Sequence, residues 1–486
     1  MTGLIIPWVI ASAALLAQPG EDFSARPFYV PANPKYTIVD SAVDSVRFTV
    51  EKTLRPDERG HLVSISSFVD AEGNVMGWHD FGNLERPGWA ANAVGGAHEI
   101  YAMGELLGKP EWQKAGLGVL DHVLEGGFID ENTGLIRPYR QTTDGKFCLN
   151  YKHHSDWLCP GSMAKVGFQL LLFADRLGDD PRAKRMRSSA VTCAAWIREH
   201  VERTPNGWFP RRTTPEGKLH RDSGDRLWQT SADSLFIVQL QAALTERGLA
   251  DYRAALKEST AVFLRSGGIF GSINHDTYDE HEDVAYAVAF RTLLAVSRLL
   301  EDDAVRTFAY EKCLAGLDQF KMQEDRNGVA TKGLLYMEKS WDTAYMWENA
   351  EAALALFEAA ADARPRDPAK SRQYEIDGLV ILRAMAGHHH GPHGFLTEGV
   401  DWNNHVGQQH HVDGKQFGDI RYTEPFLNNQ HIAEPTLYYL KHLARKTAGA
   451  SGWLDIEGNV IFRFAALTTC GAASGSRGLR RTARHR

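Results

Sequence analysis

The chain has 486 residues, 43% of them hydrophobic, which is ample for a large buried core. Its net charge of −7 lacks the basic excess of a nucleic-acid-binding protein, so no nucleic-acid partner is expected. The 12 tryptophans, 15 tyrosines and 20 histidines stand out, because flat aromatic rings suit ligand contacts as well as cores.

The N-terminus is a short apolar run that ends in small residues near Ala17. It resembles the core of a signal peptide, although no Lys or Arg precedes Arg26. We therefore expect residues 1–22 to be a signal peptide and the protein to be periplasmic or secreted. If the run is not a signal, the protein would be cytoplasmic. The run is too short to cross a bilayer and no other stretch is apolar enough, so no membrane span is predicted.

A short pattern, glycine followed by two apolar residues, recurs along the chain with steps of 61 to 80 residues. Each copy follows an amphipathic segment, so its glycine is expected at a helix C-cap. The two apolar residues are typical of a short extended piece that enters a loop. The glycines are Gly60, Gly127, Gly207, Gly268, Gly333 and Gly394.

Two kinds of helix alternate between these glycines. Apolar helices rich in small residues, which suit packing around an axis, are expected at 87–104, 160–176, 230–247, 282–299, 343–361 and 431–446. More polar partners are expected at 38–54, 110–125, 182–201, 249–265, 303–321 and 369–386.

Six inner and six outer helices predict an all-α fold, an (α/α)6 toroid over residues 23–446. The N-terminal helix is expected to close the ring against the last inner helix. An open solenoid or a generic bundle is the alternative. Residues 447–486 do not fit the repeat and are expected to form a partly disordered C-terminal tail.

The loops that enter the inner helices are long, whereas the opposite turns are tight. The long loops span 126–158, 205–229, 266–281, 323–342 and 388–430. Elaborated loops on a rigid scaffold are where function concentrates. The N-terminal ends of the inner helices meet on the same face, and their partial positive charges favour an anionic ligand such as an acidic sugar.

Tryptophan beside Asp, His or Asn recurs on this face. Sugars offer C–H faces that pack on aromatic rings, and their hydroxyls need polar partners. The sequence therefore predicts an oligo- or polysaccharide partner, although any single tryptophan equally fits the core. The candidate binding residues are Trp78, His79, Trp89, His153, His154, Trp157, Trp228, His281, Trp341, Trp347, Trp402, Arg421 and Tyr422.

Glycosidic cleavage needs an acid to protonate the leaving oxygen and a carboxylate to act on water or on the anomeric carbon. The candidates are Asp156, Asp342, Glu348, Asp80 and Glu424. Asp156 is the first choice, because aromatic and histidine neighbours would raise its pKa. Asp342 or Glu348 would be the second group. Asp342 also fits a helix N-cap, and Glu424 fits a turn before Pro425.

Histidines are dense in the segment 388–411. Zinc is one possible ligand for them, but neither HExxH nor a cysteine pair with metal-site spacing occurs. We therefore predict no metal and no other cofactor. The histidines are expected to form hydrogen bonds with substrate or backbone.

In organisation, residues 38–446 resemble the six-hairpin glycosidase superfamily. They look like the unsaturated glucuronyl and rhamnogalacturonyl hydrolases of glycoside hydrolase families 88 and 105, and like the family 154 β-glucuronidases. The resemblance implies a pocket at the inner-helix rim with Asp residues as acid and base. Asp156 is the best positional match for such a residue and Asp80 a weaker one.

The Arg-Xaa-Asn-Gly-Trp motif associated with family 105 is absent, and Glu85-Arg86-Pro87-Gly88-Trp89 only echoes it, one repeat early. This departure argues against hydration of unsaturated sugars. It leaves a β-glucuronidase-like glycoside hydrolase with a uronic acid preference as the expected function.

Three other functions fit the same fold. A polysaccharide lyase would use a Tyr or His base and a charge neutraliser, and its product would gain ultraviolet absorbance. A sugar epimerase would release no reducing end. A non-catalytic glycan-binding protein would show no turnover. Lyase candidates are Tyr151, His153, His154, His281, Tyr336 and Tyr422 with Arg421.

Overall fold

The computed structural model describes residues 36–65, 68–75, 90–140, 145–148, 157–220, 231–271, 273, 279–390, 394–403, 417–448 and 452–463. The inner helices are α2 (Ala90–Leu107), α4 (Pro160–Leu177), α6 (Leu235–Glu246), α8 (Asp283–Leu300), α10 (Met346–Ala363) and α12 (Ala433–His442). The outer helices are α1 (Ile38–Phe48), α3 (Pro110–Glu125), α5 (Pro181–His200), α7 (Arg253–Arg265), α9 (Asp303–Phe308) and α11 (Pro368–Ala386).

Short 3-10 and π segments extend several of these helices, namely η2 (Thr49–Thr53), η4 (Ala232–Ser234), η5 (Ala309–Leu314), η6 (Leu317–Phe320) and η7 (Pro425–Asn429). With these extensions, the helices lie within a few residues of the predicted ranges. The strands are two to four residues long and pair antiparallel. Most of them were not predicted, because so few residues show no period-two pattern; β2 and β8 match extended pieces expected after Gly60 and Gly394.

The strands are β1 (Leu54–Pro56), β2 (Leu62–Ser64), β3 (Val69–Asp70), β4 (Tyr139–Arg140), β5 (Phe147–Cys148), β6 (Ala344–Tyr345), β7 (His389–His390), β8 (Phe395–Leu396), β9 (Gly399–Asp401), β10 (Gly418–Asp419), β11 (Tyr422–Thr423), β12 (Arg445–Lys446), β13 (Gly452–Leu454) and β14 (Val460–Arg463). They form small sheets in the loops and at the C-terminal end, with orders β1-β2, β10-β9-β6, β11-β3, β12-β13-β14, β4-β5 and β7-β8.

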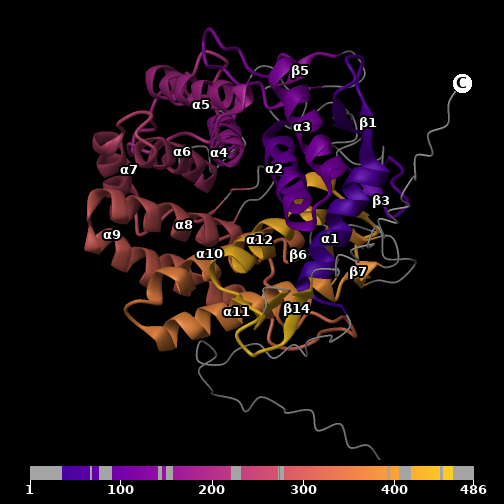
Figure 1. The fold of residues 1–486 in the computed structure, drawn as a ribbon. Helices are drawn as coiled ribbons and strands as arrows, with labels where there is room; N and C mark the ends of the chain where they lie inside the picture. Colours follow the sequence, from indigo (N-terminus) through magenta and orange to yellow (C-terminus); the bar gives the residue numbers. More distant parts are fainter. Residues whose placement is uncertain are drawn as a thin grey trace, which may run out of the picture.

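The inner helices form a closed ring. Each packs against the next, from α2 to α4, α6, α8, α10 and α12, and α12 returns to α2. Helix α1 packs against α12, α11 and α2, so the N-terminal helix covers the point of closure as predicted. The outer helices α3, α5, α7, α9 and α11 lie at the periphery (Figure 1). The predicted (α/α)6 toroid is therefore confirmed.

The two layers differ in burial as their sequences do. Residues 235–245 of α6 are all buried, because an inner helix touches neighbours on every side. On outer helix α7, only Leu256, Ser259, Thr260, Val262 and Phe263 are buried, which is the single stripe of an amphipathic helix.

The six repeated glycines all adopt positive φ, between +73° and +102°. Gly127 follows the C-cap of α3, where a left-handed residue ends the helix as predicted. The C-cap prediction is wrong for four of the glycines, which lie several residues beyond the last helical residues Thr53, His200, Phe320 and Ala386; they are Gly60, Gly207, Gly333 and Gly394. The predicted extended pieces are present as β2, as β8 and as the isolated bridges of Ile129, Phe270 and Leu335.

Strands β12 to β14 form a sheet against the ring. The Thr37 hydroxyl before α1 donates to the Ile461 carbonyl at 2.9 Å, and Arg383 of α11 pairs with Asp455 at 2.7 Å. Chain with defined structure therefore continues past residue 446, as far as residue 463. The expected signal peptide and residues 464–486 lie outside the described residues.

Within the described ranges, none of the helices combines the length and the apolar character needed to cross a membrane.

Close contact between α2 and α3 depends on Gly116. A Cβ at this position would lie 2.6 Å from the Ala97 carbonyl oxygen and 2.9 Å from the Tyr101 nitrogen. Because backbone atoms cannot swing aside, Gly116→Ala is expected to lower the free energy of unfolding by about 1–3 kcal/mol. Denaturant or thermal unfolding would measure the loss. Gly118→Ala, on the same helix, meets only the flexible Leu62 side chain at 3.1 Å and should be nearly neutral, so equal losses would contradict this account.

Candidate active site

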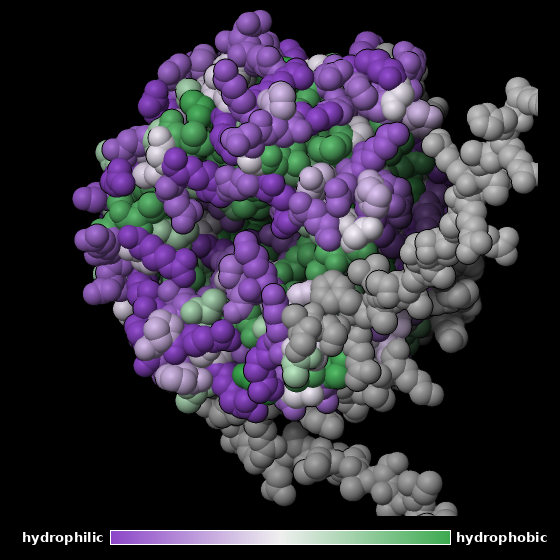
Figure 2. Space-filling model, viewed as in Figure 1, coloured by the Kyte–Doolittle hydropathy of each residue, from purple (hydrophilic) through white to green (hydrophobic). Residues whose placement is uncertain are grey.

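A cavity lies among the inner helices on the axis of the ring. Helix α4 lines it with the partly exposed residues Lys165, Phe168, Gln169 and Leu172, spaced as one face of a helix. Hydrophobic residues gather around the centre of the face shown in Figure 2, whereas its rim is mostly hydrophilic. The other lining residues are Gly95, His98, Glu99, Phe236, Gln239, Arg291, Glu351, His431 and Glu434.

Lys165 enters the cavity from the second turn of α4. Its Nζ donates to Asn92 Oδ1 on α2 at 3.0 Å and lies 5.2 Å from the Trp347 ring and 5.5 Å from the Phe236 ring. Burial lowers the pKa of Lys165, while the surrounding carboxyl groups, Glu351 foremost, act in the opposite direction. Among the described residues, no carboxylate forms an ion pair with this ammonium group.

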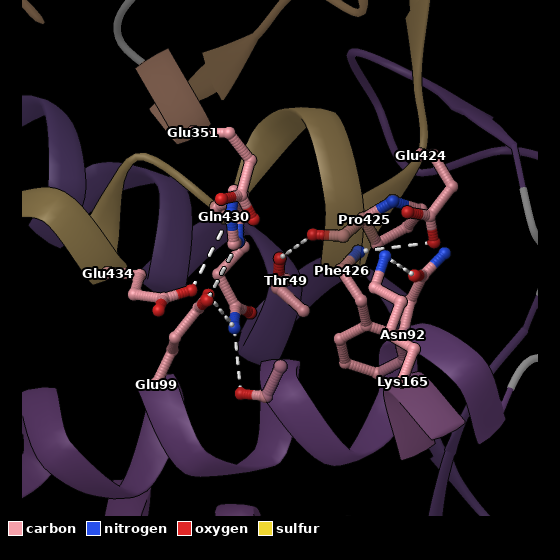
Figure 3. Close-up of polar contacts among 12 residues, drawn as sticks. Thr49, Asn92, Glu99, Lys165, Glu351, Glu424, Pro425, Phe426, Gln430 and Glu434 are labelled. Atoms are coloured by element: carbon pink, nitrogen blue, oxygen red, sulfur yellow. Dashed lines mark hydrogen bonds and ion pairs between the residues drawn. The ribbon is translucent and has the colours of Figure 1, made fainter. Parts of the chain in front are cut away.

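Glu424 lies beside Lys165 at the start of η7, and its side chain is buried. Its Oε1 accepts a hydrogen bond from the Phe426 backbone N–H at 3.3 Å, so the predicted turn-fixing role is confirmed. Burial raises the pKa of Glu424 to about 8, although Lys165 works against this shift. At neutral pH the group is therefore mainly a carboxylic acid. Glu424, Asn92 and Lys165 point toward one another (Figure 3).

His431 lies deeper in the same cavity, between α2 and α10. Its Nδ1 is 3.1 Å from Glu99 Oε1 and its Nε2 is 3.1 Å from Glu351 Oε1. Both ring nitrogens face side-chain oxygens of Glu, an arrangement in which an imidazolium donates to both. Burial alone would lower the pKa of His431, but the hydrogen bonds to Glu351 and Glu99 raise it to about 10.

Arg291 of α8 carries the second positive charge of this cluster. It pairs with Glu351, with Glu358 at 3.0 Å and with Glu434 at 3.5 Å. Although burial opposes the ionisation of Glu351, Arg291 and then His431 hold the pKa of that carboxyl well below its usual range. Figure 3 shows Glu99, Glu351 and Glu434 converging, and these residues come from α2, α10 and α12. Arg291 and His431 are therefore already neutralised by the protein.

The same cluster contains donors that suit a metal ion. Ligand atoms of Glu99, His431 and Glu434 lie within 4.8 Å of one another. A metal ion would need a neutral His431 with a free nitrogen, whereas both nitrogens are hydrogen-bonded to carboxylates. The imidazolium itself supplies the positive charge at this position.

This arrangement predicts a pH dependence of stability. The pKa of His431 is about 10 in the folded protein, against an ordinary value of 6.5. Its contribution is therefore fully present below about pH 6.5 and is lost as the pH rises toward 10. We expect the melting temperature of the wild type to exceed that of His431→Gln most near pH 6, with the gap narrowing toward pH 10. A gap that stays constant over this range would rule out a charged His431.

Many of the predicted site residues lie outside the described part of the chain. They are Asp80 and Asp156 among the catalytic candidates, and Trp78, His79, Trp89, His153, His154 and Trp228 among the binding candidates.

Asp342 lies in a group of predicted residues at the sheet of β6, β9 and β10. Its Oδ2 accepts from Asn403 Nδ2 at 2.5 Å, and its backbone carbonyl accepts from Trp402 Nε1 at 2.7 Å. The neighbouring Trp341 donates to the Tyr345 hydroxyl at 2.8 Å. Helix α10 begins at Met346 with Tyr345 as its N-cap residue, so the alternative that Asp342 caps this helix is wrong.

Glu348 and Trp347 occupy the first turn of α10. Glu348 is fully buried and shares a hydrogen bond with Asp283, whose pKa burial raises to about 8. Both carboxyl groups are fully buried, and neither is among the residues that line the cavity. Trp347 brings its ring under Lys165. The structure thus places Trp347 with Glu424, and Asp342 with Trp402.

The other predicted residues have structural contacts of their own. The Arg212 guanidinium lies 4.1 Å from the centre of the Trp157 ring, and His281 Nδ1 is 2.7 Å from the Tyr286 hydroxyl. Tyr422 is fully buried and packs edge-on against Phe68. Arg421 is exposed.

The histidine-rich segment divides among several sites. His388 Nδ1 and His390 Nε2 both approach Asp419, at 2.6 and 2.9 Å, and His388 Nε2 contacts the Ala330 carbonyl. His389 lies against Ser41 of α1 at 2.7 Å. The prediction that these histidines bond to backbone is confirmed for His388. His393, His405, His410 and His411 lie outside the described residues.

Sequence reasoning missed Lys165, Asn92, Glu99, Arg291 and Glu351. Except for Asn92, their signal was present, because charged residues interrupt helices that were otherwise assigned to the apolar inner ring. Charged side chains are rarely buried unless paired, so such interruptions are candidates for sites inside the ring.

No protein-family model and no curated protein matches the chain. Several solved structures do match the chain in fold. A cellobiose 2-epimerase from Bacillus thermoamylovorans B4167 is 11% identical with a TM-score of 0.55, over 82% of this chain and 99% of that one. A D-mannose isomerase is 11% identical with a TM-score of 0.58, over 85% and 100%. A structure of a UGL variant with dGlcA-Glc-Rha-Glc is 12% identical with a TM-score of 0.52, over 83% and 96%. The chain therefore shares the (α/α)6 toroid fold with these structures.

Proposed function

We propose that the protein is a glycoside hydrolase that acts on an acidic, uronic-acid-containing glycan. The observation that carries the proposal is the position of Glu424. It is a buried carboxyl with a pKa of about 8, beside Lys165, which lines the axial cavity. Glycosidic cleavage requires a carboxylic acid that is still protonated near neutral pH.

In this proposal Glu424 gives its proton to the leaving glycosidic oxygen as the bond to the anomeric carbon breaks. A second carboxylate acts on water or on the anomeric carbon. The candidates are Asp342, the Glu348–Asp283 pair, and Asp156 or Asp80 outside the described residues. The Trp347 ring offers a face for the sugar.

Solved structures of the same fold support a sugar substrate. UGL, with dGlcA-Glc-Rha-Glc, carries a uronate-type sugar, and the epimerase and isomerase are sugar enzymes by name. The alternative of an epimerase or lyase needs a neutral base near the sugar. His431, held as an imidazolium between Glu99 and Glu351, does not offer one, whereas His98 of the cavity lining, whose pKa burial lowers to about 3, is neutral. Product analysis therefore distinguishes the hydrolase from these alternatives.

The test is a panel of 4-nitrophenyl uronides paired with the corresponding neutral glycosides, followed by oligosaccharides that contain glucuronate. The proposal expects a saturated uronic acid as product. Activity should fall as the pH rises above about 8, because the acid loses its proton. A product that gains ultraviolet absorbance but has not taken up a water molecule would instead identify a lyase. An isomer formed without a new reducing end would identify an epimerase. Binding without turnover would identify a lectin-like protein.

A further inference from the structure

We infer that Lys165 and Asn92, between the rings of Trp347 and Phe236, form the receptor for the carboxylate of the bound sugar. This inference rests on the proposed function and assigns its acid specificity to one position on α4.

The first argument is the charge balance of the cavity. Arg291 already meets three Glu side chains, and both nitrogens of His431 meet Glu side chains. Lys165 alone among the described cations that line the cavity has a neutral partner, the Asn92 amide oxygen at 3.0 Å. An ammonium group that lines a cavity and has no direct ion-pair partner gains most from an anion that enters with the substrate.

The second argument is the shape around Lys165. Two aromatic rings lie 5.2 and 5.5 Å from its Nζ, so the approach to the ammonium group has apolar walls that suit the C–H faces of a sugar ring. One turn further along α4, Gln169 lines the same cavity. Its Oε1 is buried with no hydrogen-bond partner among the described residues, and so remains an acceptor for a ligand hydroxyl.

A competing explanation is that Lys165 serves only Glu424, its neighbour in the protein. That role would affect every substrate equally, whereas a carboxylate receptor affects only acidic ones. The ratio of activities on a uronide and on its neutral counterpart separates the two roles, because the sugars differ at C6 alone.

The experiment compares 4-nitrophenyl β-D-glucuronide and 4-nitrophenyl β-D-glucoside. Lys165→Met is expected to lower kcat/KM for the glucuronide by about 10- to 100-fold, the loss of one hydrogen bond to a charged group, with no comparable loss on the glucoside. Asn92→Asp, nearly the same shape, should produce the same selective loss, since its carboxylate pairs with Lys165 in place of the substrate.

Lys109→Met is the matched control. Lys109 also lies over a tryptophan, 4.0 Å from the Trp112 ring centre, but at the turn before α3 and away from the cavity lining. It should leave both activities unchanged. Equal losses on both substrates in Lys165→Met would assign Lys165 to Glu424 instead. An unchanged glucuronide activity would place the carboxylate elsewhere. Unfolding curves show that each variant is folded.

A binding measurement keeps the inference separate from the hydrolase proposal. Calorimetry or ligand-observed NMR with sodium glucuronate, against glucose, needs no turnover. The carboxylate receptor is supported if the wild type binds glucuronate, Lys165→Met and Asn92→Asp lose that binding, and Lys109→Met keeps it. If the wild type at the same time cleaves neither glycoside, the hydrolase proposal is refuted while the receptor inference is kept. A wild type that binds glucuronate no better than glucose overturns the receptor.

Discussion

Glu424→Gln is expected to lower turnover of a glycan substrate by about 10²- to 10⁴-fold, the usual contribution of a general acid. Because the buried Glu424 is mainly protonated at neutral pH, the amide changes no charge beside Lys165. The Gln side-chain oxygen can still accept the hydrogen bond from the Phe426 N–H that begins η7. Only the acidic proton is removed, so substrate binding and fold should be kept.

The measurement compares two leaving groups on the same sugar. A poor leaving group, such as an alkyl or sugar alcohol, needs protonation and should show the full loss in Glu424→Gln. Fluoride or a dinitrophenolate leaves without much help and should lose far less. Glu424→Gln should also lose the fall in activity above about pH 8. Equal losses for both leaving groups would mean that Glu424 does not act as the acid.

Arg291→Met is expected to cost about 3–5 kcal/mol of folding free energy, the largest stability effect that we predict. The substitution leaves Glu351, Glu358 and Glu434 facing one another without their shared cation. These carboxylates come from α10 and α12, so their repulsion acts where α8, α10 and α12 meet in the ring. Burial makes the repulsion strong, since solvent cannot screen it.

Arg298→Met is the matched control, since it lies seven residues further along α8. Arg298 also pairs with a carboxylate of α10, Asp362 at 2.9 Å, but its side chain is 54% exposed against 9% for Arg291. Asp362 keeps its ion pairs with Arg306 and Arg366 when Arg298 is replaced. A solvent-exposed partner contributes about 0–1 kcal/mol, so this variant should unfold almost like the wild type. The two variants are compared by thermal and denaturant unfolding. Similar stabilities would mean that the buried cluster does not support ring closure.

Helix positions could be predicted closely because they depend on local patterns. Apolar periodicity, small residues and turn residues mark α4 and α8 within a residue or two, and the repeated glycines show the order of the hairpins. Where the pattern was ambiguous, the prediction was less accurate. Gly207 and Gly394 do not cap helices, because their positive φ belongs to turns further along the loops.

The candidate site could not be predicted in the same way. The sequence determines the six-fold alternation of apolar and amphipathic helices, since each helix repeats a face every 3.6 positions. The sequence alone does not show which charged residues meet on the axis, because Lys165, Arg291, Glu351 and Glu424 are brought together only when the ring closes. Burial then changes the chemistry of those groups: it raises the pKa of Glu424 to about 8 and lowers the pKa of Lys165, and neither effect exists in the separate helices.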